Sequence, residues 1–208
     1  IQKAAFEKNS RLLYPQNGID YKKLEFRSGE QLTNIQCWFK KFKSYQEMRI
    51  KSKVIFDNLS FGRASNLFEE ALKDVGEMLG FESQRPDNEY KVGPDNLWCG
   101  VHNQYLFFEC KNEAKKDRIT IKKTEAGQMN NHSAWFKEKY SDAEVCRIFV
   151  APTNVLDQKA NLTHEVVVMT PNLLDKFKYN LDSFLMEFKN YTLSDVDKDL
   201  IQEALVTH

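Results

Sequence analysis

The sequence has no closely spaced cysteine pair, no long apolar run and no excess of charge of either sign. No stretch of about 18 apolar residues occurs, so we predict no transmembrane helix and no membrane contact. The 30 basic residues balance the 30 acidic ones, which disfavours nucleic-acid binding through bulk charge but permits a local basic groove. The cysteines are scattered without a CxxC pair, which argues against a zinc site and favours a reducing, cytoplasmic setting. They are Cys37, Cys99, Cys110 and Cys146.

Several other features are missing. There is no glycine-rich phosphate loop, internal repeat or low-complexity segment, so the usual sequence sign of a nucleotide site is absent. The first residues lack an initiator Met and the apolar core of a signal peptide, and we expect the chain to be part of something longer. The 208 residues, 41% hydrophobic and 29% charged, have room for one well-packed globular domain with an appendage.

The first 60 residues differ in pattern from the rest. They mix aromatic residues with lysine, as in WFKKFKSYQEM (38–48), and have few β-branched runs. The pattern predicts a mostly helical accessory region over 1–60, followed by a domain over 61–208. The apolar positions at helical spacing include Ile35, Trp38, Phe39 and Phe42.

The second region predicts an α/β fold with a sheet between helices. Residues 65–81 carry an apolar stripe at helical spacing, with Ser65 or Asn66 as candidate N-cap and Gly80 as the end. A final short helix is expected to about residue 205, capped by Ser194. Further helices are predicted at 122–139 and 171–188, and strands at 95–101, 105–111, 146–152 and 165–169, the last two buried.

Three charged residues occupy the ends of the first two predicted strands. Asp95 follows Pro94, and Glu109 and Lys111 end the apolar run YLFFECK. Glu109 and Lys111 are two positions apart, so on a strand both side chains point to the same face. Asp95 and Glu109 are fourteen positions apart, which suits two paired strands joined by a short turn. Adjacent carboxylates repel unless a cation lies between them, so the pattern predicts a metal ion.

These residues resemble a known family. GPDNLW (93–98) followed by FFECKNEA (107–114) is similar to the PD-(D/E)XK, or restriction-endonuclease-like, nuclease superfamily. FEEAL (68–72) with LGF (79–81) resembles that family's first core helix, and TEAGQM (124–129) with SAWF (133–136) resembles its later helix. The resemblance covers roughly residues 60–188. It is strongest to nuclease domains at the C-termini of bacterial DEAD/DEAH-type helicase-like proteins.

The resemblance implies a restriction-endonuclease-like core with a central mixed sheet flanked by helices, and a Mg²⁺-dependent nuclease acting on DNA. Mn²⁺ is expected to substitute, and a helicase motor is an expected partner. Asp95 and Glu109 would be catalytic metal ligands, joined by the backbone carbonyl of Cys110 and by Glu69. Lys111 would be the catalytic lysine, and Gln128 would help to hold substrate or water. Phosphate contacts are expected from Lys115, Lys116, Lys122 and Lys123.

Other interpretations of the same residues stay open. Glu70 is the alternative to Glu69, because the helix offers two adjacent carboxylates, and Asp95 could be an ordinary turn residue. The lysine runs could be solvated faces. His102 and His132 are expected to be ordinary surface residues. As an alternative, one polar stripe of the predicted later helix could face the same cleft; it comprises Lys122, Glu125, Gln128 and His132. At the level of function, the alternative is a catalytically silent module that binds nucleic acid or docks a partner chain.

Overall fold

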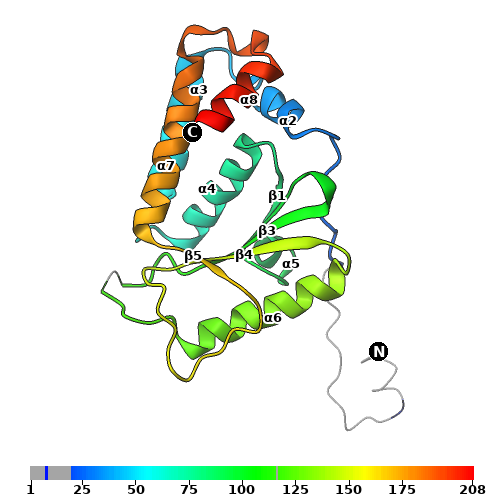
Figure 1. The fold of residues 1–208 in the computed structure, drawn as a ribbon, viewed down its shortest axis with the longest axis vertical. Helices are drawn as coiled ribbons and strands as arrows, with labels where there is room; N and C mark the ends of the chain where they lie inside the picture. The colour runs from blue at the N-terminus through cyan, green and yellow to red at the C-terminus, as the bar shows by residue number, and fades with distance from the viewer. Residues whose placement is uncertain (1–7, 9–19, 116) are drawn as a thin grey trace.

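A five-stranded mixed sheet forms the centre of the molecule (Figure 1). The computed structural model describes residue 8, residues 20–115 and residues 117–208. The strands lie in chain order; the first two pairings are antiparallel and the last two parallel. They are β1 (Glu82–Gln84), β2 (Asn96–Cys99), β3 (Gln104–Cys110), β4 (Glu144–Val150) and β5 (Val167–Met169).

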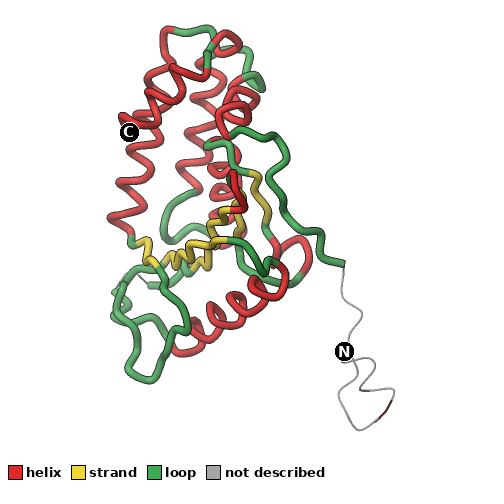
Figure 2. Tube along the Cα trace, turned by 45° about the vertical axis from the view of Figure 1, so that its right-hand side comes forward, coloured by secondary structure: helices red, strands yellow, loops and turns green. Residues whose placement is uncertain are grey.

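Helices cover both faces of this sheet (Figures 1 and 2). One face is covered by α6, and the other by α4 with the helices that pack around it. No helix in the described part of the chain is long and apolar enough to cross a membrane. The helices are α2 (Gln31–Phe39), α3 (Tyr45–Asn58), α4 (Ser65–Met78), α5 (Pro86–Tyr90), α6 (Lys123–Lys139), α7 (Pro171–Met186) and α8 (Lys198–Thr207). The predicted α/β class, with a mixed sheet between helices, is confirmed.

Side chains on β3 alternate between two hydrophobic clusters, as strand geometry requires. Tyr105 and Phe107 belong to the cluster that includes α6. Phe108 and Cys110 belong to the cluster that includes α4. Glu109 therefore faces the α6 side of the sheet, and the Cys110 thiol is buried on the opposite side, as predicted.

The N-terminal region is helical where α2 and α3 lie, as predicted, but residues 20–30 carry no helix. Residues 1–7 and 9–19 of the predicted helical region lie outside the described residues. The apolar side chains of α2 and α3 share one hydrophobic cluster with α4, α7 and α8. These helices thus pack together around α4 on one side of the sheet.

The predicted helix caps need correction. The N-cap of α4 is Ala64 rather than Ser65 or Asn66. The Ser65 amide instead donates to Glu113 Oε1 at 3.0 Å, because the turn after β3 lies over the start of the helix. In α8 the cap is Asp197, whose side chain accepts from the Leu200 amide, rather than Ser194.

Some strand and turn predictions also need correction. The strand at the end of the sheet, β5, is not buried, and Val167 is 51% exposed, because this strand pairs with β4 alone. β1 and α5 are not among the elements predicted from the sequence. Both elements are too short for an apolar period to emerge. Gly80, with φ of +80°, follows the end of α4 as predicted, since a left-handed residue there favours glycine.

Candidate active site at the end of β3

The register of β2 and β3 brings two carboxylates together. Asn96 is paired with Phe108, so continuing the antiparallel register by one residue sets Asp95 opposite Glu109. Asp95 Oδ2 accepts a hydrogen bond from the Cys110 amide at 2.6 Å, which ties the start of β2 to the end of β3. This is the pairing that the spacing of the two residues predicted.

Glu109 is a buried carboxylate, only 1% exposed, with a cationic partner on each oxygen. Lys111 Nζ donates to Glu109 Oε1 at 2.7 Å, and both side chains lie on the same face of the strand, as predicted. His132 Nδ1 lies 2.7 Å from Glu109 Oε2. The second contact comes from α6, so the site joins a strand end to the helix that covers it.

The two carboxylates have opposite protonation tendencies. Burial and the negative charge of Glu109 raise the pKa of Asp95 from its ordinary value of 3.8 to about 7. Burial also acts to raise the pKa of Glu109, but the hydrogen bond from His132 and the charge of Lys111 outweigh it, and that pKa is lowered. Glu109 therefore holds the negative charge of the pair, and Asp95 is the member that burial and repulsion destabilise.

The same carboxylate, Glu109, raises the pKa of both cationic partners. Burial acts to lower the pKa of Lys111, but the charge of Glu109 dominates and the pKa is raised. His132 follows the same pattern: burial acts to lower its pKa, and the hydrogen bond to Glu109 raises it. Glu109 therefore favours the charged form of both side chains.

The helix carboxylates of α4 are held by Arg85, which is 4% exposed. Its Nη2 lies 2.6 Å from Glu69 Oε2, and its Nη1 lies 2.9 Å from Glu70 Oε2. Glu69 is the less exposed of the two, at 15% against 53% for its side chain, and its charge also raises the pKa of Asp95. The charge of Glu69 is therefore felt at Asp95, and Glu69 already has an arginine bound to it.

The remaining predicted residues lie around this centre. Gln128 is exposed on α6, one turn before His132, and forms no hydrogen bond within the described residues. Lys122 and Lys123 are exposed at the start of α6, and Lys115 is exposed in the loop after β3. None of these three lysines forms an ion pair with another described residue. Lys116 lies outside the described residues.

Two residues at the site were not predicted. His132 was expected to be an ordinary surface residue; instead it contacts Glu109. Its position seven residues after Glu125 and four after Gln128, on one polar stripe of α6, was the available signal. Arg85 lies between a short strand and a proline, and no pattern in the sequence marks its guanidinium as buried.

Few side chains at this site could coordinate a metal ion. Across the part of the chain that the structure describes, no three or more His, Cys, Asp or Glu side chains are grouped so as to hold a metal ion. Asp95 and Glu109 are the two carboxylates that lie together, and both offer only oxygen. Such a pair suits a hard cation that keeps most of its water ligands.

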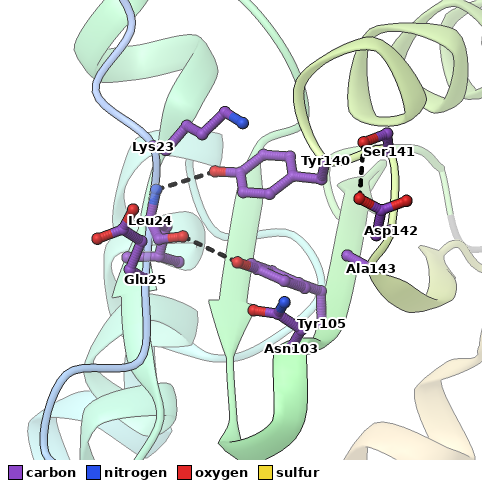
Figure 3. A pocket seen from close by; sticks show the side chains of 9 residues that line it. All are labelled: Lys23, Leu24, Glu25, Asn103, Tyr105, Tyr140, Ser141, Asp142 and Ala143. Atoms are coloured by element: carbon purple, nitrogen blue, oxygen red, sulfur yellow. Dashed lines mark hydrogen bonds between the residues drawn. The ribbon is translucent and has the colours of Figure 1, made fainter.

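A surface pocket of about 200 Å³ lies near the other end of β3. Figure 3 shows the Tyr140 hydroxyl bonded to the Leu24 amide and the Tyr105 hydroxyl bonded to the Leu24 carbonyl. Tyr105 and Glu109 are four residues apart, which is roughly 13 Å along a strand. This pocket is therefore separate from the carboxylate pair.

Comparisons with protein families, with curated proteins and with solved structures found no match for this chain. What the molecule does is therefore inferred from its own residues. The most informative of them are the buried Glu109 and the half-buried Asp95, whose charges repel, with Lys111 at the end of the same strand as Glu109.

Proposed function

We propose that this protein is a Mg²⁺-dependent nuclease that hydrolyses DNA phosphodiester bonds, as the nuclease module of a larger DNA-processing or defence protein. One observation carries the proposal. The half-buried Asp95 lies opposite the buried Glu109, and Lys111 is bonded to Glu109. Placing like charges together in the interior is unfavourable unless a cation or a proton compensates them, which is the arrangement expected of a metal-dependent hydrolase.

The fold agrees with the resemblance found in the sequence. The chain runs from α4 through β1, β2 and β3 to α6 and then β4. The first of these helices is the one that resembles the family's first core helix, and α6 is the one that resembles its later helix. We propose that the sheet and these helices form a restriction-endonuclease-like core.

Asp95, Glu109 and the backbone carbonyl of Cys110 would hold Mg²⁺, with Mn²⁺ as a substitute. Magnesium keeps several waters, so two carboxylates are sufficient protein ligands. When bound, the ion would neutralise phosphate charge and activate a water. Because Arg85 already binds Glu69, that carboxylate is better suited to orient a metal-bound water than to bind the ion directly.

The chain's own cations would hold the substrate. The Lys111 side chain is 19% exposed, so its ammonium group can reach a phosphate while its stem stays in the site. Lys122 and Lys123 carry positive charge at the start of a helix, where the helix dipole disfavours it, which is consistent with a role outside helix stability. With Lys115 they would contact phosphates, without reading sequence. Gln128, exposed beside them, remains a candidate for holding substrate or water.

A catalytically silent module that binds nucleic acid or docks a partner, such as a helicase motor, is the second candidate. A specific observation favours it: both Glu109 oxygens already have protein partners, and Glu69 has Arg85. A carboxylate so fully paired does not require a metal ion to remain buried.

Plasmid cleavage separates the two candidates. The chain is incubated with supercoiled and branched DNA in Mg²⁺ or Mn²⁺, with and without a chelator. We expect metal-dependent nicking that the chelator abolishes and that Lys111→Ala lowers by at least about 100-fold, since a preorganised charge at the phosphate is lost. Lys137→Ala, an exposed lysine on the same helix as His132, is the matched control.

Chelator-insensitive cleavage, or full activity in Lys111→Ala, would contradict the nuclease proposal. Metal-independent DNA binding without any cleavage would instead support the silent module.

A further inference from the structure

His132 differs from Lys111 in how it reaches Glu109. It projects from the middle of α6, whose neighbouring side chains Met129, Ser133 and Phe136 are buried. Its imidazole turns about only two side-chain bonds, whereas the lysine has four and can swing its charge away while its stem stays in place. The histidine is therefore the fixed partner of this carboxylate, and the lysine is the exchangeable one.

The hydrogen bond to Glu109 also shows which ring nitrogen of His132 carries a proton. An ionised carboxylate only accepts, so the proton of this hydrogen bond is on Nδ1 of His132. Within the described residues, Nε2 of His132 has no hydrogen-bond partner, and the side chain is 23% exposed. One edge of the ring thus holds Glu109, and the other edge has no partner among the described residues.

We infer that His132 is a positioning residue: its Nδ1–H holds Oε2 of Glu109 and leaves Oε1, the oxygen shared with Lys111, as the one available to a divalent cation. The inference rests on the proposed function. Ligating carboxylates are commonly oriented by such an outer hydrogen bond, and its loss weakens metal affinity by about 10–100-fold. The role is distinct from that of Lys111, which must leave Oε1 for the cation to approach.

Three substitutions of His132 distinguish the roles of its two ring nitrogens. His132→Asn puts an amide nitrogen near the place of Nδ1, His132→Gln puts one near the place of Nε2, and His132→Ala removes both. We expect Mn²⁺ affinity, measured by calorimetry on the full chain, to fall by about 10–100-fold in the Ala and Gln variants and to be largely kept in the Asn variant. His102→Asn is the matched control, because His102 is exposed at the other end of β3 and its φ of 57° suits asparagine.

A second measurement does not depend on metal binding or on activity. The chain has four histidines, so ¹⁵N-labelled imidazole spectra can resolve His132. We expect a protonated Nδ1 whose resonance moves in Glu109→Gln, while the resonances of His102 stay in place. An unshifted His132 resonance would overturn the inference even if an alanine variant fails to fold.

The outcomes also separate this inference from the proposed function. If the unmodified chain binds Mn²⁺ and His132→Ala binds it equally well, the positioning role is wrong and the nuclease proposal stands. If the unmodified chain binds no Mn²⁺ and cuts no DNA, both are wrong. Loss in the Ala and Gln variants with recovery in the Asn variant supports both.

Discussion

Two polar clusters lie on the α6 side of β3, one at each end of the strand. The tyrosine cluster is at its start, and the carboxylate cluster is at its end. Both lie on the same face of the sheet, but the tyrosine cluster is neutral and the carboxylate cluster is charged. The tyrosine cluster consists of Tyr21, Tyr105 and Tyr140; the carboxylate cluster consists of Asp95, Glu109, Lys111 and His132.

The tyrosine cluster is neutral, and its hydroxyls have partners. The Tyr21 hydroxyl donates to Gln84 Oε1 at 3.0 Å, and the Tyr140 hydroxyl accepts from the Leu24 amide at 2.9 Å. Burial raises the pKa of Tyr21 and of Tyr105 far above the ordinary range, so no charge develops there. This cluster fastens the extended segment 20–27 to the domain.

The carboxylate cluster contains charges that repel. Asp95 and Glu109 oppose each other's ionisation, and burial strengthens the effect. A protein that only needed to close this end of the sheet could do so with neutral hydrogen bonds, as it does at the other end. Under the proposed function, the tyrosine cluster contributes stability and the carboxylate cluster contributes the chemistry.

The largest effect is expected from Asp95→Asn without divalent cations. The pKa of Asp95 is raised to about 7, so the folded chain binds this proton more tightly than the unfolded chain, and stability is lost as pH rises from about 4 to 7. Asparagine removes the charge and keeps an acceptor for the Cys110 amide. Above pH 7 the variant should gain about 1.4 kcal/mol for each unit of pKa displacement removed, and near pH 4 the gain should vanish.

Urea denaturation in a chelator across this pH range measures the effect of Asp95→Asn. Asp142→Asn, an exposed aspartate, is the control and should show no pH-dependent gain. A variant less stable than the unmodified chain at pH 8 would mean that the Asp95 carboxylate is structural, and the division between the clusters would fail.

Arg85→Ala should destabilise the chain by about 2–3 kcal/mol, because it leaves the Glu69 carboxylate poorly solvated and without its partner. Arg85→Lys keeps the charge but loses the fork that binds Glu69 and Glu70 together, and it should recover only part of the stability. Thermal unfolding of the three proteins measures this. Unchanged stability in Arg85→Ala would show that the α4 carboxylates do not need the arginine.

Tyr140→Phe should cost about 1–2 kcal/mol, because the Leu24 amide and the Tyr21 hydroxyl each lose a partner. Metal-dependent cleavage per folded molecule should be unchanged. Tyr179→Phe is the control, since Tyr179 is 72% exposed and should alter neither quantity. Loss of cleavage in a folded Tyr140→Phe protein would show that the tyrosine cluster also contributes to cleavage.

The smallest effect is expected from the exposed lysines. Lys122→Ala and Lys123→Ala should each weaken DNA binding and reduce the slope of log affinity against log salt by about 0.9, the value for one lost phosphate contact. Lys53→Ala, an exposed lysine on α3, is the control. If log affinity falls with log salt at the same slope in all variants, these lysines do not contact DNA phosphates.

The secondary structure could be predicted where apolar residues recur at helical spacing over many residues. The stripe over 65–81 predicted α4, and the helix predicted over 122–139 is α6, which begins one residue later. Prediction of secondary structure and burial failed where contacts with the rest of the fold decide them. β1 and α5 are too short for a period, and the β5 sequence resembles a buried strand although it lies at a sheet edge.

The end of β3 was determined largely by the sequence. A spacing of fourteen residues between Asp95 and Glu109, and of two between Glu109 and Lys111, is enough to bring the three together, because strand pairing and alternation are local rules. Only the tertiary structure decided that Arg85 would occupy the α4 carboxylates and that His132 would hold Glu109. Those contacts depend on how a helix lies against a sheet, a geometry that packing sets across the whole core.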